Sequence, residues 1–142
     1  MRALQIVELT GPESALRLVE VPEPEPSHML TPGAGVVVEV HAAGVSFPEV
    51  LQTRGEYQVK PPLPFVPGSE VAGIVRSSAE GSAFAPGDRV AAFCMLGGFA
   101  ELAVAPEFLT FALPDALDFA QGAGLILNYH TAYFALVTRG RL

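Results

Sequence analysis

The side chains of this sequence that could do chemistry are mainly neutral hydrogen-bonding groups. Ser46 and Tyr57 lie in a stretch rich in glycine and proline, residues 41–75, and Asn128 and Thr131 lie three residues apart near the end of the chain. Residues three apart share one face of a helix. Hydroxyl and carboxamide groups donate and accept hydrogen bonds, so these side chains suit a carbonyl or amide group of a ligand. No acid–base pair is evident beside them.

Each of these residues also has a structural interpretation. Ser46 precedes a helical pattern at 47–54, and serine is a preferred helix N-cap. Tyr57 could be a half-buried tyrosine whose hydroxyl contacts water. Thr131 could bond back to its own helix, and Asn128 could cap that helix. The residue types alone leave both interpretations open.

The cysteine and histidine side chains indicate structural roles. Cys94 is the only cysteine, so no intrachain disulfide can form, and a reducing compartment is expected. It falls in an apolar strand pattern, which favours an inert buried thiol over a nucleophile. We expect His28, His41 and His130 to be surface or structural residues, and His28 lies in a proline-rich segment that we expect to be a surface loop.

Composition limits the function classes. The 142 residues suit one domain, and 50% of them are hydrophobic. The charged fraction, 16%, is below the roughly 25% typical of soluble domains, which indicates that part of the surface is buried against something else. The net charge of −7 argues against nucleic acid as a partner. No apolar run approaches the roughly 20 residues that span a bilayer, and a signal peptide is not evident, so we expect a cytoplasmic protein that does not bind membranes.

The hydrophobic pattern predicts many short strands followed by helix. Val36, Val37 and Val38 are consecutive, which indicates a strand buried on both faces. Gly73 within a strand pattern indicates a bulge or a close backbone approach. A short helix is expected at 47–54, closed by Gly55. Strands are expected within the segments 4–7, 16–21, 35–45, 69–78, 85–96, 97–106 and 108–114.

The C-terminal segment has a helical pattern. Asp118 is a candidate N-cap for a short helix, and we expect a break near Gly122–Gly124 and a longer helix from about Asn128 to Arg139. The longer helix is apolar on more than one face, which fits a helix that lies between two domains. The pattern as a whole predicts a β-barrel-like body, residues 1–125, and a helix, residues 126–142, that leads toward a second domain.

The stretch HAAGVSFPEVLQTRGEYQVKPPLPFVPGSEVAGIV resembles the catalytic domain of zinc-free medium-chain dehydrogenases/reductases, in the quinone oxidoreductase and zeta-crystallin branch. The segments FAPGDRV, GGFAELAVAP and LPDALDFAQGAGLILNYHTAYFAL follow that branch in the same order. The positions that match the motif of the branch are Gly44, Val45, Glu49, Gly55, Tyr57, Pro64, Pro67, Gly68, Glu70 and Gly73.

The resemblance implies a fold that is mainly β with C-terminal helices, a GroES-like β-barrel substrate domain. In such proteins a Rossmann domain follows and holds NADPH. No G-x-G-x-x-G loop occurs in these 142 residues, so we expect the Rossmann domain to be absent from this chain, which is then a fragment or a natural short protein. A homodimer is common among such reductases and is possible here.

The resemblance also implies roles for single residues. Ser46 stands where the branch usually carries Asn and zinc-dependent relatives carry Cys, and Ser69 stands where those relatives carry His. A neutral hydroxyl is a poor zinc ligand, so no metal is expected. The resemblance implies Ser46 and Tyr57 as catalytic contacts, although Tyr57 follows Arg54 one residue sooner than in the pattern. It implies Ser46, Asn128 and Thr131 as cofactor contacts, and Glu70 as a structural hydrogen-bond acceptor.

The implied function is the substrate-domain part of an NADPH-dependent quinone oxidoreductase that transfers hydride to quinones or related conjugated carbonyls. Reduction of enoyl or alkenal double bonds is an alternative with the same residues. A second alternative is a non-catalytic GroES-like module that binds a partner domain or subunit through its C-terminal helix. A structural, crystallin-like role is disfavoured by the low charged fraction.

Overall fold

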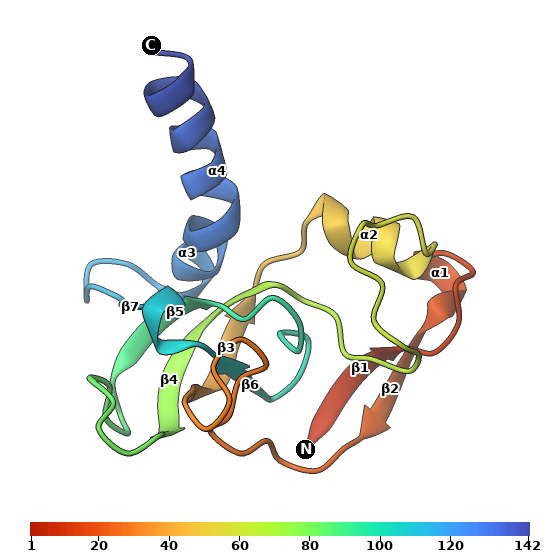
Figure 1. The fold of residues 1–142 in the computed structure, drawn as a ribbon, viewed down its shortest axis with the longest axis horizontal. Helices are drawn as coiled ribbons and strands as arrows, with labels where there is room; N and C mark the ends of the chain where they lie inside the picture. Colours follow the sequence, from red (N-terminus) through yellow and green to blue (C-terminus); the bar gives the residue numbers. More distant parts are fainter.

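A computed structural model describes residues 1–142 as two antiparallel sheets and a long C-terminal helix (Figure 1). The larger sheet has the strand order β6-β3-β4-β5-β7, and the smaller one pairs β1 with β2. The strands are β1 (Arg2–Ile6), β2 (Leu16–Glu20), β3 (Val36–Ala43), β4 (Glu70–Ser78), β5 (Arg89–Phe93), β6 (Leu102–Ala105) and β7 (Thr110–Ala112). The helical segments are α1 (Pro12–Ala15), α2 (Phe47–Thr53), η1 (Glu107–Leu109), α3 (Phe119–Gly124), η2 (Leu125–Tyr129), α4 (His130–Tyr133) and η3 (Phe134–Arg139).

The architecture confirms the predicted class, mainly β with C-terminal helices, but strand pairing does not close the sheet into a barrel. The edge strands β6 and β7 pair only with β3 and β5. The β1–β2 hairpin contacts the rest of the body through isolated bridges, Ala3 to Ala100 and Ile6 to Phe65. The body is therefore an open five-stranded sheet with a hairpin packed beside it.

The core lies on both faces of the large sheet. Val36, Val37 and Val38 are all fully buried, as their run of three predicts. Val36 and Val38 pack in one apolar cluster with residues of β4, β5 and β6. A second cluster joins Ala72, Ala91, Leu113 and Ala123, so it attaches α3 to the sheet. The C-terminal helix therefore packs on the large sheet through α3.

Gly73 confirms the predicted close approach. The register between β3 and β4 shifts between Val40 and Ala42, which leaves His41 in a bulge. A Cβ atom on Gly73 would collide with the backbone carbonyl oxygen of Glu39. Only glycine fits here, because the backbone of the paired strand β3 fills the space that a side chain on Gly73 would occupy.

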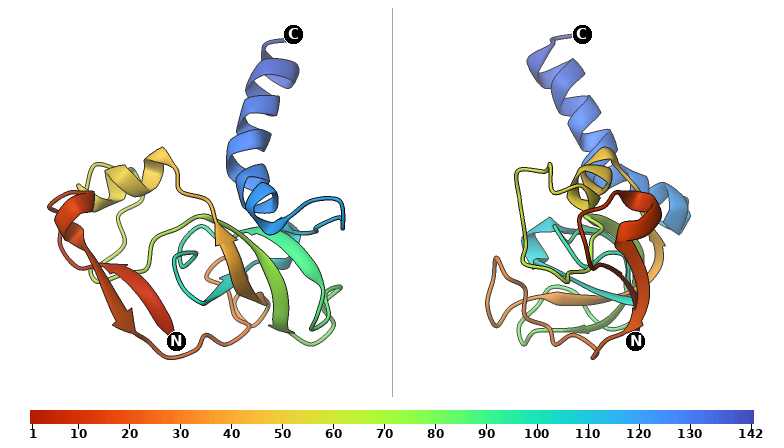
Figure 2. Two further views of the ribbon diagram at one scale, coloured as in Figure 1. Left: turned by 180° about the vertical axis from the view of Figure 1, so that it is seen from behind. Right: turned by 90° about the vertical axis from the view of Figure 1, so that its right-hand side faces the viewer.

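The predicted break near Gly122–Gly124 is wrong, because the helix is continuous from α3 to η3 (Figure 2). Asp118 caps it as predicted: its carboxylate accepts a hydrogen bond of 2.7 Å from the backbone N–H of Gln121. Gly124 has φ −89° and ψ −9°, within the right-handed helical region. Gly122 is a packing residue, since a Cβ atom there would lie 3.0 Å from Ala72 and from Leu113. Gly122 therefore allows the helix to approach the sheet, and neither glycine ends the helix.

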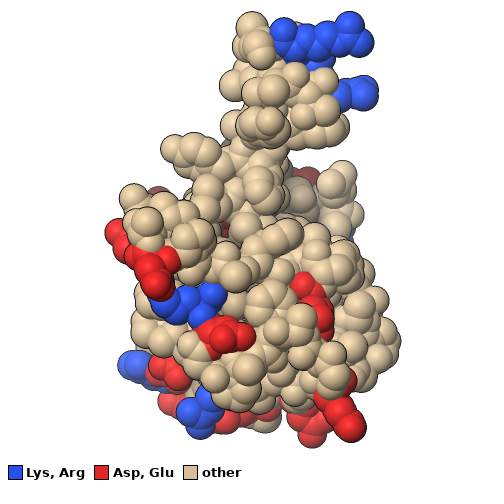
Figure 3. All heavy atoms as spheres, turned by 90° about the vertical axis from the view of Figure 1, so that its left-hand side faces the viewer, with Lys and Arg blue, Asp and Glu red and all other residues tan.

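Beyond η2 the helix stands away from the body (Figures 1 and 2). Figure 3 shows uncharged atoms along one face of this projection, with basic side chains only near its end. The predicted apolar character on more than one face is confirmed, because large apolar side chains are exposed along its length: Tyr129, Tyr133, Phe134, Leu136 and Val137. The division into 1–125 and 126–142 stays a prediction. None of the helices combines the length and the hydropathy that a membrane span requires.

The proline-rich loop before β3 is anchored by a buried histidine. The backbone N–H of Leu30 donates to Nδ1 of His28, and Nε2 of His28 lies 3.1 Å from the carbonyl oxygen of Cys94. These partners require the neutral ring with its proton on Nε2. Cys94 is fully buried, and burial raises the pKa of its thiol to about 12. The predicted burial of the thiol is confirmed, and His28 is buried although the sequence predicts a surface loop around it.

Replacing the two glycines of α3 separately tests their roles. Gly124→Ala should raise the free energy of unfolding by about 0.5–1 kcal/mol, since its Cβ would meet nothing within 4 Å and alanine favours helix. Gly122→Ala should lower it by about 1–3 kcal/mol, because the added methyl overpacks the contact with the sheet. Urea denaturation of both variants measures the difference. Equal effects, or the opposite order, would show that the helix does not pack as described.

Candidate functional site

A hydrogen-bonded network of side chains lies where the start of α2, the start of β4 and η2 meet. The carboxamide nitrogen Nδ2 of Asn128 lies 2.6 Å from Oε1 of Glu70 and 2.8 Å from Oγ of Ser46. These residues come from separate parts of the chain, so the tertiary fold alone brings them together. The structure thereby joins two of the predicted site residues, Ser46 and Asn128.

Ser46 is held by the helix that follows it. It occupies the N-cap position of α2, and its backbone N–H donates to Oε2 of Glu49 at 2.9 Å. The other oxygen of Glu49 accepts a bond of 2.8 Å from the hydroxyl of Ser69. Ser46 therefore begins the helix, as the capping interpretation predicts, and its hydroxyl also accepts from Asn128, while its catalytic and cofactor roles stay predictions.

Glu70 is the buried centre of the network. Its side chain is fully buried, and Oε2 accepts a bond of 2.7 Å from the backbone N–H of Leu127 while Oε1 accepts from Asn128. Burial raises the pKa of Glu70 above its ordinary value, an effect that the negative charge of Glu49 increases and that the bonds from Leu127 and Asn128 oppose. The structure thus places Glu70 as the hydrogen-bond acceptor that the sequence led us to expect.

The backbone around Glu70 restricts the position of its carboxylate. A Cβ atom on Gly44 would collide with the Glu70 carboxyl group, so glycine is needed there for the carboxylate to lie against β3. The helix segment that meets it, η2, is a π-helical turn, a wider turn that recurs at functional sites. The backbone N–H of Leu127 in this turn points to the carboxylate, which attaches the helix to the first residue of β4.

The two other predicted residues lie outside the network. Thr131 is exposed one turn beyond Asn128 and its hydroxyl makes no hydrogen bond, so the interpretation that this hydroxyl bonds back to its helix is wrong. Asn128 does not cap a helix either, because the helix runs through it. Tyr57 is half-buried after α2, where it lines a small cavity of about 40 Å³ with Leu9 and Phe65. Its predicted catalytic role remains a prediction.

The sequence interpretation gave no site role to Glu49 or Ser69, and it did not identify the Leu127 N–H as a partner of Glu70. A local signal exists for Glu49, which follows Ser46 by three residues in the pattern of a capping box. No local signal marks the contact of Leu127, 57 positions after Glu70, because a backbone donor has no sequence signature.

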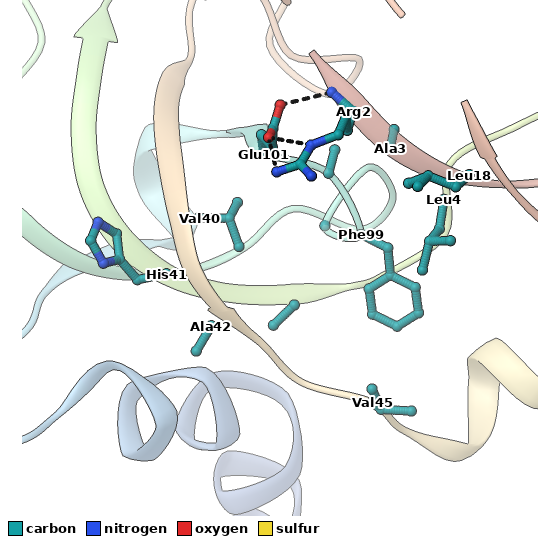
Figure 4. A pocket seen from close by; sticks show the side chains of 13 residues that line it. Arg2, Ala3, Leu4, Leu18, Val40, His41, Ala42, Val45, Phe99 and Glu101 are labelled. Atoms are coloured by element: carbon teal, nitrogen blue, oxygen red, sulfur yellow. Dashed lines mark hydrogen bonds and ion pairs between the residues drawn. The ribbon is translucent and has the colours of Figure 1, made fainter. Parts of the chain in front are cut away.

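An apolar cavity of about 440 Å³ lies beside the network (Figure 4). It runs between the β1–β2 hairpin and the end of β3, and it reaches the network only at Val45, the neighbour of Ser46. Arg2 and Glu101 form an ion pair of 2.7 Å at its edge, and hydrogen bonds from Arg2 lower the pKa of Glu101. The apolar side chains labelled there include Leu4, Leu18, Val40 and Phe99.

The donor set of the network is poor in metal ligands. The backbone N–H of Ser46 and the hydroxyl of Ser69 both donate to Glu49, and no three His, Cys, Asp or Glu side chains converge anywhere in the chain. What the network offers is a set of hydroxyl and carboxamide groups beside a buried carboxylate. Such groups can orient a polar ligand by hydrogen bonds.

Known proteins with similar sequences identify the class of fold that holds this network. Residues 32–115 match the alcohol dehydrogenase GroES-like domain family, and the chain belongs to that family. It is 45% identical to the quinone oxidoreductase of Rattus norvegicus, over 99% of this chain and 42% of that protein. The resemblance to the quinone oxidoreductase branch is thereby confirmed.

Solved structures show the same likeness. A probable oxidoreductase from Mycobacterium abscessus superposes with a TM-score of 0.87 at 49% identity, covering 100% of this chain and 44% of that one. The quinone oxidoreductase from Thermus thermophilus, solved alone and with NADPH, superposes with a TM-score of 0.80 at 34% identity, covering 99% of this chain and 41% of that one. The chain therefore spans less than half the length of these relatives.

The raised pKa of Glu70 predicts a pH dependence of stability. Between its ordinary pKa of 4.5 and its higher value in the folded state, Glu70 binds more protons when folded than when unfolded. Its contribution to the free energy of unfolding therefore declines as the pH rises through this interval. Glu70→Gln should remove that decline, which urea denaturation at a series of pH values measures.

Glu101→Gln is the matched control for this measurement. The pKa of Glu101 is lowered by hydrogen bonds from Arg2, so its contribution is present above the ordinary pKa and is lost as the pH falls. Removing Glu101 should therefore leave the decline at higher pH unchanged. An identical pH slope for the wild-type protein and Glu70→Gln would show that Glu70 is not the buried acid described here.

Proposed function

We propose that this chain is the substrate-domain part of an NADPH-dependent quinone oxidoreductase that reduces quinones or related conjugated carbonyls. The observation that carries the proposal is the hydroxyl of Ser46, which is half-buried, accepts a hydrogen bond from Asn128 and follows Val45, a lining residue of the apolar cavity. The names of the relatives from Rattus norvegicus and Thermus thermophilus support the same reaction class.

The residues of this chain fit a nicotinamide cofactor. Oδ1 of Asn128 and the hydroxyl of Thr131 have no partner within the chain, and both side chains are exposed on the same helix. Asn128, Thr131 and Ser46 would contact the polar groups of the cofactor. NADPH, when bound, supplies the hydride. The Thermus thermophilus relative was solved with NADPH, which supports this choice of cofactor.

The chemical role of the chain is to bind, orient and stabilise the acceptor. A quinone that accepts hydride develops negative charge on a carbonyl oxygen, and a hydrogen-bond donor placed there stabilises that charge. Ser46 is such a donor, and Tyr57 is a second candidate. The resulting hydroquinone anion takes its proton from water, so the reaction needs no acid–base pair in the site.

A nucleotide-binding domain of the Rossmann type is the proposed partner of the C-terminal helix. The exposed apolar side chains along α4 and η3 offer it a packing surface, of which Tyr133 and Phe134 are the largest. Homodimer formation would be compatible with the same helix. We further propose a zinc-independent site, because serine hydroxyl groups are poor zinc ligands and that of Ser69 donates to Glu49, and a cytoplasmic location, because the single buried Cys94 suits a reducing compartment.

Two alternatives use the same features. Enoyl or alkenal reduction needs the same donors, since charge also develops on a carbonyl oxygen. A non-catalytic module would use only the exposed helix to bind a partner domain or subunit, and the apolar side chains of that helix favour such a role as much as they favour an enzyme.

The assay follows NADPH oxidation by the complete natural protein that carries these residues, with 1,4-naphthoquinone and a 2-alkenal as acceptors. Ser46→Ala should lower kcat/KM for the quinone by about 10- to 100-fold, because it removes a donor to the developing oxyanion. Ser46→Thr keeps a hydroxyl and should retain most activity. Ser14→Ala, at a half-buried serine of α1 whose hydroxyl donates only to Thr10, is the control and should have no effect.

The outcomes separate the candidates. Faster reduction of the alkenal than of the quinone would favour the enoyl alternative. Absence of turnover with both acceptors would contradict an enzyme and favour the partner-binding module. Full activity of Ser46→Ala with the quinone would contradict the role given to this hydroxyl.

A further inference from the structure

We propose that Glu70 and Asn128 are positioning residues that make the hydroxyl of Ser46 a hydrogen-bond donor toward the ligand, so that the site selects a carbonyl acceptor over a hydroxyl group. This inference deepens the proposed function and rests on it for the identity of the ligand. It rests on which group donates and which accepts in each hydrogen bond, followed from the buried carboxylate of Glu70 to Asn128 and then to Ser46.

The direction is set at Glu70. An ionised carboxylate can only accept hydrogen bonds. Its Oε2 accepts from the backbone N–H of Leu127 at 2.7 Å, and its Oε1 lies 2.6 Å from the carboxamide of Asn128. A carboxamide oxygen at that distance would place two acceptors against each other. The NH₂ group of Asn128 must therefore face Glu70.

The same nitrogen fixes the direction at Ser46. Nδ2 of Asn128 carries two hydrogens, and it lies 2.8 Å from Oγ of Ser46 as well as 2.6 Å from Glu70. One hydrogen goes to each oxygen, so Oγ of Ser46 accepts. The proton of the Ser46 hydroxyl is then not used in this bond, and Ser46 donates to no other group of the chain through its side chain. It is available to a ligand.

The backbone holds the carboxylate and the carboxamide in contact. Glu70 is fully buried at the start of β4, and its carboxyl group occupies the space that a side chain at Gly44 would fill. The backbone N–H of Leu127 points to this carboxylate from a continuous helix that packs on the sheet through α3. Asn128 is the next residue in that helix. The ionised carboxylate therefore meets the NH₂ group of Asn128, because a rotated carboxamide would place its oxygen against another acceptor.

The consequence is a preference between the two redox forms of a quinone. A quinone carbonyl oxygen accepts from the Ser46 hydroxyl, and the hydroxyl oxygen of the protonated hydroquinone is a weaker acceptor of the same bond. The site therefore binds the oxidised substrate more tightly than the reduced product, which assists product release.

The first test does not depend on activity. The complete natural protein, labelled with ¹⁵N, is examined by NMR for the two NH₂ protons of Asn128, assigned by their loss in Asn128→Asp. Ser46→Ala and Glu70→Gln should each shift these resonances, and Ser14→Ala should shift neither. If either of the first two variants leaves both resonances unchanged, the proposed direction is overturned.

The second test is a double-mutant cycle with 1,4-naphthoquinone. Asn128→Leu should lower kcat by about tenfold, the equivalent of one lost hydrogen bond of about 1.4 kcal/mol. In the Ser46→Ala background, at saturating NADPH, it should have little further effect on kcat, because Asn128 acts on the quinone through Ser46, whereas its contact with the cofactor changes KM for NADPH. Losses that multiply in the double variant would overturn the positioning role.

The two tests separate the inference from the proposed function. If the protein does not reduce quinones but the NMR shifts occur, the reaction class is wrong and the direction of the network stands. If quinone reduction occurs and the NH₂ resonances do not respond, the function stands and the inference falls.

Discussion

A buried carboxylate that must find donors is the constraint on which this structure depends. Glu70 lies at the first position of β4 without contact with solvent, and an unpaired charge there would be costly. The backbone of Leu127 and the side chain of Asn128 supply the donors. These bonds attach the C-terminal helix to the sheet at Glu70. The apolar packing of Ala123 against the sheet is a second attachment of the same helix.

This attachment links the fold to the chemistry. The helix carries Asn128 to Ser46, and α2 holds Ser46 through Glu49. The result is a site whose hydrogen-bond donors are neutral and in which the negatively charged carboxylate of Glu70 is buried. Such an arrangement suits a reaction in which the cofactor supplies the reducing power and the protein supplies orientation and hydrogen bonds. Beyond the site, the same helix exposes the apolar surface that a partner domain would cover.

The sequence predicted what local patterns determine. The strands, α2 and the cap at Asp118 follow from alternation, proline placement and capping residues, and all are present. The break at Gly122–Gly124 was wrong because Gly122 serves a tertiary contact with Ala72, which no local pattern reveals. The prediction of a closed barrel was wrong for a related reason, because closure depends on pairing between edge strands that lie far apart in the sequence. In the site, Ser46 and Asn128 were identified singly, but their connection through Glu70 required the folded chain.

The most direct test of the central claim is the pH dependence of the Leu127 amide resonance, measured by ¹⁵N–¹H NMR on the complete natural protein. An amide that donates to a carboxylate changes its shift when that carboxylate is protonated. We predict that the Leu127 resonance titrates with a midpoint above the ordinary pKa of 4.5 for a glutamate and that Glu70→Gln abolishes the titration. A Leu127 resonance that does not change with pH, or one that titrates equally in Glu70→Gln, would contradict the claim that Glu70 holds the helix.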